Sequence, residues 1–165
     1  MGTRSGDLDP GILLYLEREC GFSIADLDQL LNSRSGLLGV CGENDMREIL
    51  TRLEQGDERA ELACAIFCYR LKKYIGAYAA VLGRLDALVF SGGIGAKSAV
   101  IRERVCAGLD LLGIRLDPVR NRSVVGEVSG IDDNSGGVRV LAVETDEELE
   151  IARQGLALWS SATSS

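Results

Sequence analysis

A glycine cluster directly after an apolar run is the feature of this sequence that points most clearly to chemistry. Residues 86–90 (Asp-Ala-Leu-Val-Phe) have the composition of a strand, residues 91–95 read Ser-Gly-Gly-Ile-Gly, and residues 97–102 begin a helix. Glycine lets a backbone approach a ligand closely because it has no Cβ, and the N–H groups at a helix start attract negative charge. The pattern favours a nucleotide or phosphate ligand, and its alternative is an ordinary strand-to-helix turn.

The glycine cluster matches neither of two familiar phosphate-binding signatures. A dinucleotide-binding fingerprint needs a third glycine where Ser98 stands, and an acidic residue about twenty positions later. A P-loop needs glycine followed at once by lysine, whereas Ala96 separates Gly95 from Lys97. A phosphate or nucleoside bound here would therefore require a different architecture.

Composition excludes several classes of protein. The chain has 165 residues, a formal net charge of −7 and no histidine. The lack of histidine excludes Ser-His-Asp and Cys-His catalysis within the chain, and the negative charge argues against a nucleic-acid-binding surface. No apolar run reaches the roughly twenty residues that span a bilayer. The five cysteines have no paired short spacings, which predicts free thiols, so we expect a cytoplasmic protein without nucleic-acid or membrane partners.

Local patterns predict many helices and few strands. Helices are expected at residues 10–20, 24–31, 45–53 and 57–82, and from residue 97 to about residue 112. Strands are expected at residues 87–90 and 138–143, with short ones at 114–116 and 124–128. Residues 35–42 are punctuated by glycine and are expected to form a packed loop.

The sequence also predicts how the long helix packs and how the last helix begins and ends. The long helix is expected to bury most of a wide apolar stripe, with Gly76 marking close packing against another helix; the stripe comprises Leu62, Ile66, Phe67, Leu71, Tyr74, Ile75 and Tyr78. Thr145 is expected to be the N-cap of the last helix, with Glu148 completing a capping box. Residues 160–165 are expected to be a disordered tail.

The predicted sheet is too small for a complete α/β domain. The two longer predicted strands cannot form a sheet large enough for the helices to pack against, since sheets usually contain about five strands. The order of strand, glycine loop, helix, strand, acidic turn and helix is typical of the second half of an α/β nucleotide-binding domain. We therefore expect the chain to be part of a larger fold.

Four motifs in order give a specific resemblance. The chain opens with Met-Gly-Thr-Arg-Ser-Gly-Asp-Leu-Asp-Pro, and Ser-Gly-Leu-Leu-Gly-Val at residues 35–40 precedes Asn-Asp-Met-Arg at 44–47. Leu-Lys-Lys-Tyr-Ile-Gly-Ala-Tyr at 71–78 leads into the glycine cluster, and Thr-Asp-Glu-Glu-Leu follows at 145–149. The sequence resembles the C-terminal portion of the acetate kinase (acetokinase) family, within the superfamily of acetate and sugar kinases, heat-shock ATPases and actin. The resemblance covers all but the last few residues.

The resemblance implies a fold and a reaction. The fold would be α/β, a partial ribonuclease H-like (actin-like ATPase) domain that is helix-rich and lacks its first strands, over residues 1–159. The reaction would be reversible transfer of the γ-phosphoryl group of ATP to acetate, which gives acetyl phosphate and ADP with Mg²⁺. The family also implies a homodimer that contacts through this half.

Site residues are implied motif by motif. Arg4 would stabilise the transition state, since a planar guanidinium spreads charge over phosphoryl oxygens; the alternative is a surface arginine paired with Asp7 or Asp9. Glu147 would associate with Mg²⁺, and its alternative is a charge in the first turn of a helix. The nucleotide would be contacted by Asp45, Met46, Arg47, Gly92, Gly93, Ile94, Gly95 and Ala96.

The chain also departs from the family pattern. Ala96 and Lys97 stand where glutamate and asparagine are usual, which removes a carboxylate and adds a cation beside the nucleotide. The phosphate-binding asparagine and serine segment, the catalytic aspartate and the histidines of the family have no counterpart here, so we expect the chain alone to be inactive. Two alternatives remain open: a non-catalytic remnant or nucleotide-binding and dimerisation module, and a kinase for another short-chain carboxylate such as propionate.

Overall fold

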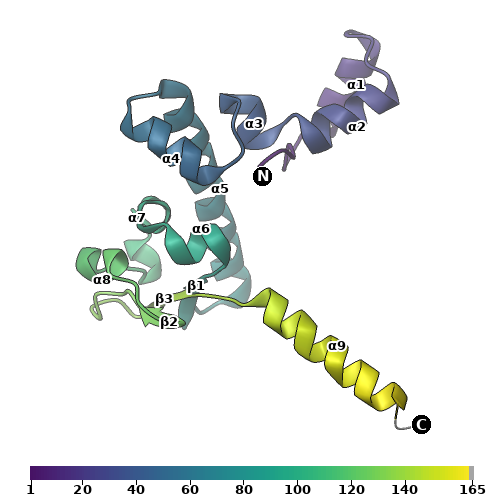
Figure 1. Ribbon diagram of the computed structural model, residues 1–165. Helices are drawn as coiled ribbons and strands as arrows, with labels where there is room; N and C mark the ends of the chain where they lie inside the picture. Colours follow the sequence, from purple (N-terminus) through teal and green to yellow (C-terminus); the bar gives the residue numbers. More distant parts are fainter. Residues whose placement is uncertain (164–165) are drawn as a thin grey trace. The chain divides into compact units, whose positions relative to one another are not determined.

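The chain folds into two compact units, Met1–Gly76 and Ala77–Ser165. The structure, a computed structural model, describes residues 1–163. Figure 1 labels the helices and strands along the chain. In the part of the chain described, no helix combines the length and the apolar character needed to cross a membrane.

The first unit is entirely helical. It contains α1 (Pro10–Arg18), α2 (Ile24–Ser33), α3 (Gly36–Cys41), α4 (Met46–Glu54) and most of α5 (Glu58–Leu82). Side chains define the helix starts: Asp9 accepts a hydrogen bond from the Gly11 N–H, and Ser23 and Asp26 form a reciprocal capping box. The predicted helices at 10–20, 24–31, 45–53 and 57–82 are confirmed to within a few residues at their ends.

The packed loop predicted at residues 35–42 is wrong, because these residues form α3. Gly36 begins the helix with φ of 63° and Gly42 ends it with φ of 76°, so the two glycines that read as loop punctuation lie at its ends. Leu37 and Cys41 are buried one turn apart and anchor the helix. A six-residue helix is too short for its periodicity to be recognised in sequence.

The long helix α5 buries a different face from the one predicted. Its buried residues are small, namely Ala60, Ala63, Cys64 and Cys68. In the predicted stripe, by contrast, Leu62 is 54% exposed and Tyr78 is 62% exposed. No atom beyond the neighbouring residues and the backbone of α5 itself lies within 4 Å of a Cβ built on Gly76, so the close helix packing expected there is also not observed in the described chain. Small side chains let a neighbouring backbone approach the helix closely. A prediction from hydrophobic periodicity favours large apolar residues and therefore missed this face.

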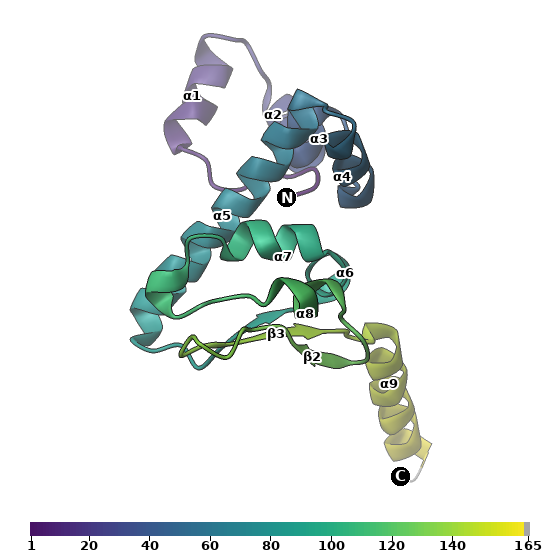
Figure 2. The same ribbon diagram turned by 90° about the vertical axis from the view of Figure 1, so that its left-hand side faces the viewer.

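A three-stranded sheet organises the second unit. Its strands β1 (Ala87–Phe90), β2 (Val128–Gly130) and β3 (Arg139–Val143) lie in the order β1-β3-β2. β3 pairs parallel with β1 and antiparallel with β2. Figure 2 shows β3 between its neighbours, with α6, α7 and α8 on one side of the sheet. The small sheet and the many helices confirm the helix-rich, partial α/β fold.

The two faces of this sheet differ in burial. Phe90, Val140 and Ala142 are buried. Because β1 and β3 pair Phe90 with Ala142 and Leu88 with Val140, these residues share one face. The opposite face carries Val89, which is 52% exposed and pairs with Leu141. One face of the sheet therefore packs in the core of the unit, while the other remains largely open among the residues described.

Two short helices replace the single helix predicted from residue 97 to about residue 112. The glycine cluster itself is helical, as α6 (Gly92–Lys97), and α7 (Ala99–Cys106) follows at once. Ser98 separates them: it ends α6 in an extended conformation, and its hydroxyl accepts a hydrogen bond from the Ile101 N–H to start α7. A 3₁₀ turn, η1 (Asp110–Leu112), and α8 (Pro118–Arg122) complete this layer.

Other strand predictions needed small corrections. Residues 114–116 contribute only an isolated bridge between Leu116 and Asp132, and residues 124–127 lie outside β2, which begins at Val128. The strand predicted at 87–90 is confirmed, and the one at 138–143 begins one residue later.

The last helix, α9 (Glu147–Thr163), starts differently from the prediction. Asp146 rather than Thr145 caps it, because the Asp146 Oδ1 accepts a hydrogen bond from the Leu149 N–H at 2.9 Å. The tail predicted to be disordered begins inside this helix, which continues to Thr163; residues 164–165 lie outside the described part. Ala, Leu and Glu, which have high helix propensity, dominate α9.

Candidate active site

The backbone around Arg4 is held by the start of α3. The carbonyl oxygens of Met1, Gly2 and Thr3 accept hydrogen bonds of 2.8–3.0 Å from the N–H groups of Leu37, Leu38 and Ser35, respectively. These N–H groups would otherwise lack partners at the helix start. Residues 1–5, called here the N-terminal strap, thus replace a side-chain cap, since Ser35 makes none.

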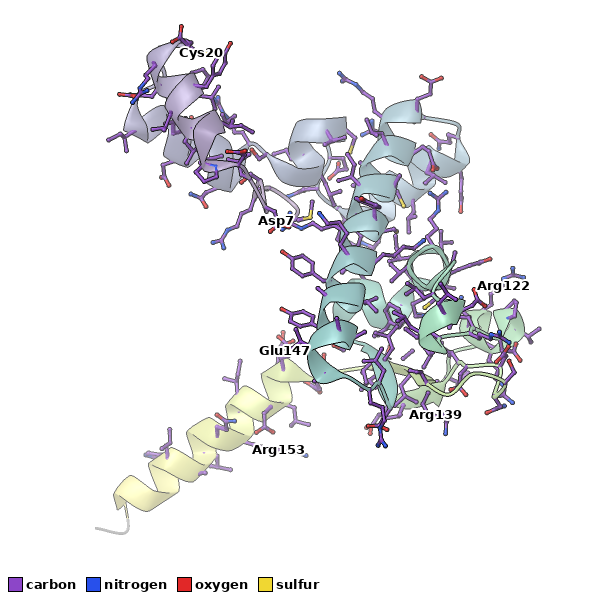
Figure 3. All side chains as sticks on the ribbon, turned by 180° about the vertical axis from the view of Figure 1, so that it is seen from behind. Asp7, Cys20, Arg122, Arg139, Glu147 and Arg153 are labelled. Atoms are coloured by element: carbon purple, nitrogen blue, oxygen red, sulfur yellow. The ribbon has the colours of Figure 1, made fainter. Side chains whose placement is uncertain are left out.

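A second attachment fixes the chain just after the strap. Asp7, which is labelled in Figure 3, pairs with the Arg70 guanidinium of α5 at 2.7 Å and accepts a hydrogen bond from the Tyr74 hydroxyl at 2.7 Å. Asp9 is used as the cap of α1. The alternative in which Arg4 pairs with Asp7 or Asp9 is therefore not observed. The Arg4 side chain is exposed and has no ion-pair partner among residues 1–163.

Asp45, Met46 and Arg47 form the start of α4. The Asp45 carboxylate caps the helix by accepting from the Arg47 N–H at 2.9 Å, and the Arg47 guanidinium folds back onto the same carboxylate. These hydrogen bonds lower the pKa of Asp45 to about 2. Met46 is buried, so a ligand could reach it only through its backbone.

The loop before α4 is braced by two charged side chains. The Glu43 carboxylate accepts hydrogen bonds from the N–H groups of Asn44 and Asp45 at 2.7 and 2.8 Å. Arg52 donates to the Cys41 carbonyl at 3.0 Å and also binds the Asp57 carboxylate. The backbone of the Asp-Met-Arg segment is thus held in place without a ligand.

The glycine cluster packs tightly against the end of β1. Gly92 has φ of 69°, which side-chain-bearing residues rarely adopt. A Cβ on Gly95 would lie 3.3 Å from the Phe90 carbonyl carbon, so α6 approaches the strand closely here. Ala96 is buried at the far end of α6. As with Met46, any ligand contact of Ala96 would use its backbone.

One cleft brings the glycine cluster and Glu147 together. It has a volume of about 870 Å³ and lies at the carboxyl ends of β1 and β3; its walls include Gly92, Gly93, Ala96, Lys97, Glu127, Glu144, Asp146, Glu147, Glu148 and Arg153. Five carboxylates face it against the two cations Lys97 and Arg153. Figure 3 places Glu147 at the start of α9 and Arg153 further along that helix. In the sequence-predicted set, Gly92, Gly93, Ala96 and Glu147 are therefore brought together, while Arg4 and Asp45–Arg47 belong to the first unit.

The residues lining this cleft fit Mg²⁺ only in combination with a ligand. No group of three His, Cys, Asp or Glu side chains within residues 1–163 is arranged to hold a metal ion. Mg²⁺ usually keeps several waters and is bound by one or two carboxylates together with substrate phosphates. Glu147 suits that role, since it provides a hard oxygen ligand on the wall of the cleft.

Several residues of the cleft were missed in the sequence. Glu127, Glu144 and Asp146 all line it, and Lys97 lies there as its position beside the nucleotide loop predicted. Glu144 and Asp146 follow β3 directly, and ligands of α/β sheets gather at carboxyl ends of strands, so that position was a usable signal. Glu127 precedes a three-residue strand and gave no such signal.

Comparison with known proteins identifies the family. The family model described as "Acetokinase family" matches residues 1–153. Acetate kinase of Sulfurovum sp. (strain NBC37-1) is 50% identical over 155 residues, which are 93% of this chain and 39% of that protein. Acetate kinase of Streptomyces griseus is 52% identical over 96% of this chain and 38% of its own length. The chain thus spans about two fifths of the length of these curated relatives.

Solved structures agree with this assignment. The crystal structure of Porphyromonas gingivalis acetate kinase matches with a TM-score of 0.88 and 43% identity, over 96% of this chain and 40% of that one. A propionate kinase from Francisella tularensis matches with a TM-score of 0.85 and 40% identity, over 92% of this chain and 38% of that one. Sequence and structure together show that this chain belongs to the acetokinase family.

Proposed function

We propose that the chain supplies the nucleotide side of an acetate kinase, which reversibly transfers the γ-phosphoryl group of ATP to acetate. The observation that carries this proposal is the cleft shared by Gly92, Gly93 and Glu147 at the carboxyl ends of two parallel strands. Membership of the acetokinase family over residues 1–153 supports it independently. The chain spans 39% of the length of the Sulfurovum relative, and the proposal accordingly places the rest of the reaction site in the part of such an enzyme that this chain does not match.

The proposed roles follow the chemistry of each group. In the second unit, backbone N–H groups of residues 92–96 contact the nucleotide. In the first unit, residues 45–47 at the start of α4 are a further proposed nucleotide-contacting segment, taken by itself. Glu147 holds Mg²⁺ together with the nucleotide phosphates, and the bound ion neutralises phosphate charge. Because five carboxylates face the cleft, a bare nucleotide would be repelled there, and binding should depend strongly on the divalent cation.

Nucleotide binding by the 165-residue chain tests this proposal. Isothermal titration with ADP should show binding in the presence of Mg²⁺ and a large loss of affinity with EDTA. Glu147→Gln should weaken Mg²⁺-dependent binding, while Glu17→Gln on α1, outside the cleft, should leave it unchanged. Absence of any nucleotide binding by a folded chain would contradict the proposal. We expect no acetyl phosphate formation by the chain alone, since the phosphoryl acceptor must also be positioned.

Arg4 is the proposed transition-state residue. An enzyme in which this chain replaces the matching segment of the Sulfurovum acetate kinase allows the test. Arg4→Ala should lower kcat by about a thousandfold, as loss of an arginine finger does, with the KM for ATP changed far less. The Arg34→Ala variant controls for loss of a surface guanidinium. A raised KM with unchanged kcat would make Arg4 a ground-state binding residue instead.

Two further properties are proposed with the function. The matched propionate kinase favours a second short-chain carboxylate as a candidate acceptor, and kcat/KM for acetate and propionate in the same joined enzyme separates the two. We also propose a cytoplasmic homodimer. A non-catalytic module would bind nucleotide but give no turnover in the joined enzyme.

A further inference from the structure

A buried arginine lies directly behind the glycine cluster. Arg102, on α7, is only 1% exposed, and within residues 1–163 it has no carboxylate partner. Burial lowers the pKa of its guanidinium, whose ordinary value is so high that the group stays charged. An uncompensated buried charge is costly, so the surrounding dipoles must stabilise it.

Those dipoles come from the carboxyl ends of two helices. The Arg102 Nη1 donates to the Gly95 and Ala96 carbonyls of α6 at 2.9 and 2.7 Å. Its Nε donates to the Asn121 side-chain oxygen at 2.7 Å, and its Nη2 to the Asn121 carbonyl in α8 at 2.6 Å. The partial negative charge at helix C-termini favours a cation at this position.

The partner side chain is fixed as well. Asn121 is itself buried, and its amide nitrogen donates to the Ala99 carbonyl at the start of α7 at 2.9 Å. Its oxygen is therefore oriented toward Arg102. The planar fork of arginine makes all four contacts at once, whereas a lysine ammonium on a flexible stem could not reach both helix ends in this geometry.

We propose that Arg102 is a positioning residue for the nucleotide cleft. It holds the carboxyl end of α6 against α8 and thereby keeps Gly92 and Gly93, at the other end of the same six-residue helix, at the wall of the cleft. Arg102 does not touch the ligand. The inference rests on the proposed nucleotide-binding function for its effect on affinity, but the ordering of α6 can be measured without any ligand.

The test uses the 165-residue chain and three variants. Arg102→Ala removes the fork, Arg102→Lys keeps the charge without the fork, and Ile131→Ala is the control, since Ile131 is fully buried in the same unit but lies at the β2 end of the sheet. Hydrogen exchange measures the amide of Ser98, which donates to the Ile94 carbonyl in the last turn of α6. ADP affinity is measured by titration with Mg²⁺ at a temperature where circular dichroism shows every variant folded.

Both Arg102 variants should lose protection of the Ser98 amide and bind ADP about tenfold more weakly or worse, which corresponds to about 1.4 kcal/mol. Millimolar guanidinium ion should restore both properties in Arg102→Ala, because it can occupy the vacated space. Ile131→Ala should keep both the Ser98 protection and the ADP affinity, even where its Tm falls as much as that of the Arg102 variants. Wild-type Ser98 protection in folded Arg102→Ala overturns the inference. A wild-type chain that binds no ADP contradicts the proposed function instead, and the exchange result still decides the role of Arg102.

Discussion

At the scale of single residues, Asp45 and Arg47 form a contact that a ligand would have to break. The Arg47 guanidinium is largely exposed, yet it lies against the Asp45 carboxylate rather than extending into solvent. A nucleotide that binds Arg47 must therefore replace the Asp45 carboxylate as the partner of the guanidinium. Because one anion replaces another, the exchange adds little to the affinity for the nucleotide, but it fixes where the nucleotide lies. The pair orients the two side chains at the start of α4 before any ligand binds, and it contributes little to the stability of the fold.

The pKa of Asp45 reports this contact directly. Because the folded-state pKa is about 2 and the ordinary value is 3.8, the stabilisation is present above pH 3.8 and is lost as pH falls through 2. Carbon-detected NMR should show the Asp45 carboxyl titrating near pH 2, and Arg47→Gln should raise its pKa toward the ordinary value. Glu48→Gln, one residue further along α4, is the control. An Asp45 pKa near 3.8 in the wild-type chain would show that the contact is not maintained in solution.

Two glycines should respond to alanine with opposite signs. Gly36 has φ of 63°, and a Cβ there would lie 2.1 Å from the Met1 carbonyl oxygen. Gly36→Ala should therefore destabilise the fold by about 1–3 kcal/mol and release the N-terminal strap. Gly76→Ala lies inside α5, where an added Cβ would meet no other element within 4 Å, and should stabilise the fold by up to about 1 kcal/mol. Urea unfolding measures both, and equal effects would contradict the role given to Gly36.

At the scale of elements, the sequence predicted those with long apolar periodicity or clear flanking signals. The helix at 57–82 and the strand at 87–90 were found because many residues report on each. α3 and α6 were missed because both are six residues long and rich in glycine, and their helical state depends on contacts from outside the helix itself. For α3 these contacts are the strap carbonyls, and for α6 they are the hydrogen bonds from Arg102.

Prediction of the candidate site was also limited to what motifs and local patterns contain. The motif resemblance indicated Gly92, Gly93 and Glu147, which line one cleft. No sequence pattern indicated that Arg102 is buried, because an arginine at the fourth position of a helix is ordinarily a surface charge. Which face of α5 is buried also depends on the neighbouring backbone, which local patterns do not contain.

The cap of α9 provides a test at this scale. Asp146→Ala should remove the hydrogen bond to the Leu149 N–H and shorten the helix from its start, at a cost of about 0.5–2 kcal/mol. Thr145→Ala should have a much smaller effect, since Asp146 occupies the cap position. Backbone NMR shifts of residues 147–150 distinguish the two variants. A larger loss of helix stability in Thr145→Ala than in Asp146→Ala would show that the capping box predicted from sequence forms after all.

At the scale of the whole molecule, each unit exposes apolar surface that a folded protein usually covers. In the first unit, Leu62 and Ile66 on α5 are 54% and 37% exposed. In the second, Val89 and Val128 are 52% and 62% exposed and lie on the same face of the sheet. Contiguous apolar surface of this kind marks contact sites or promotes association.

The 165-residue chain should therefore bind a hydrophobic dye and self-associate at micromolar concentration. Sedimentation velocity should show species larger than the monomer, and Leu62→Glu combined with Ile66→Glu should shift the distribution toward monomer. Leu111→Glu changes an isolated residue that is 100% exposed and should have no effect. A monomer with no dye binding and a cooperative melt would show that these apolar surfaces do not drive association of the chain.

The central strand of the sheet is also the last strand along the chain. β1 and β2 touch each other only through β3, so during synthesis the segment Ala87–Phe90 leaves the ribosome about fifty residues before its partner does. Contacts between such distant residues form slowly, because a long loop must close first. The nascent chain thus carries an unpaired apolar strand for several seconds, when it is most open to chaperones and to aggregation. A nascent chain stalled just before Arg139 would hold all its cleft glycines yet have no sheet to support them.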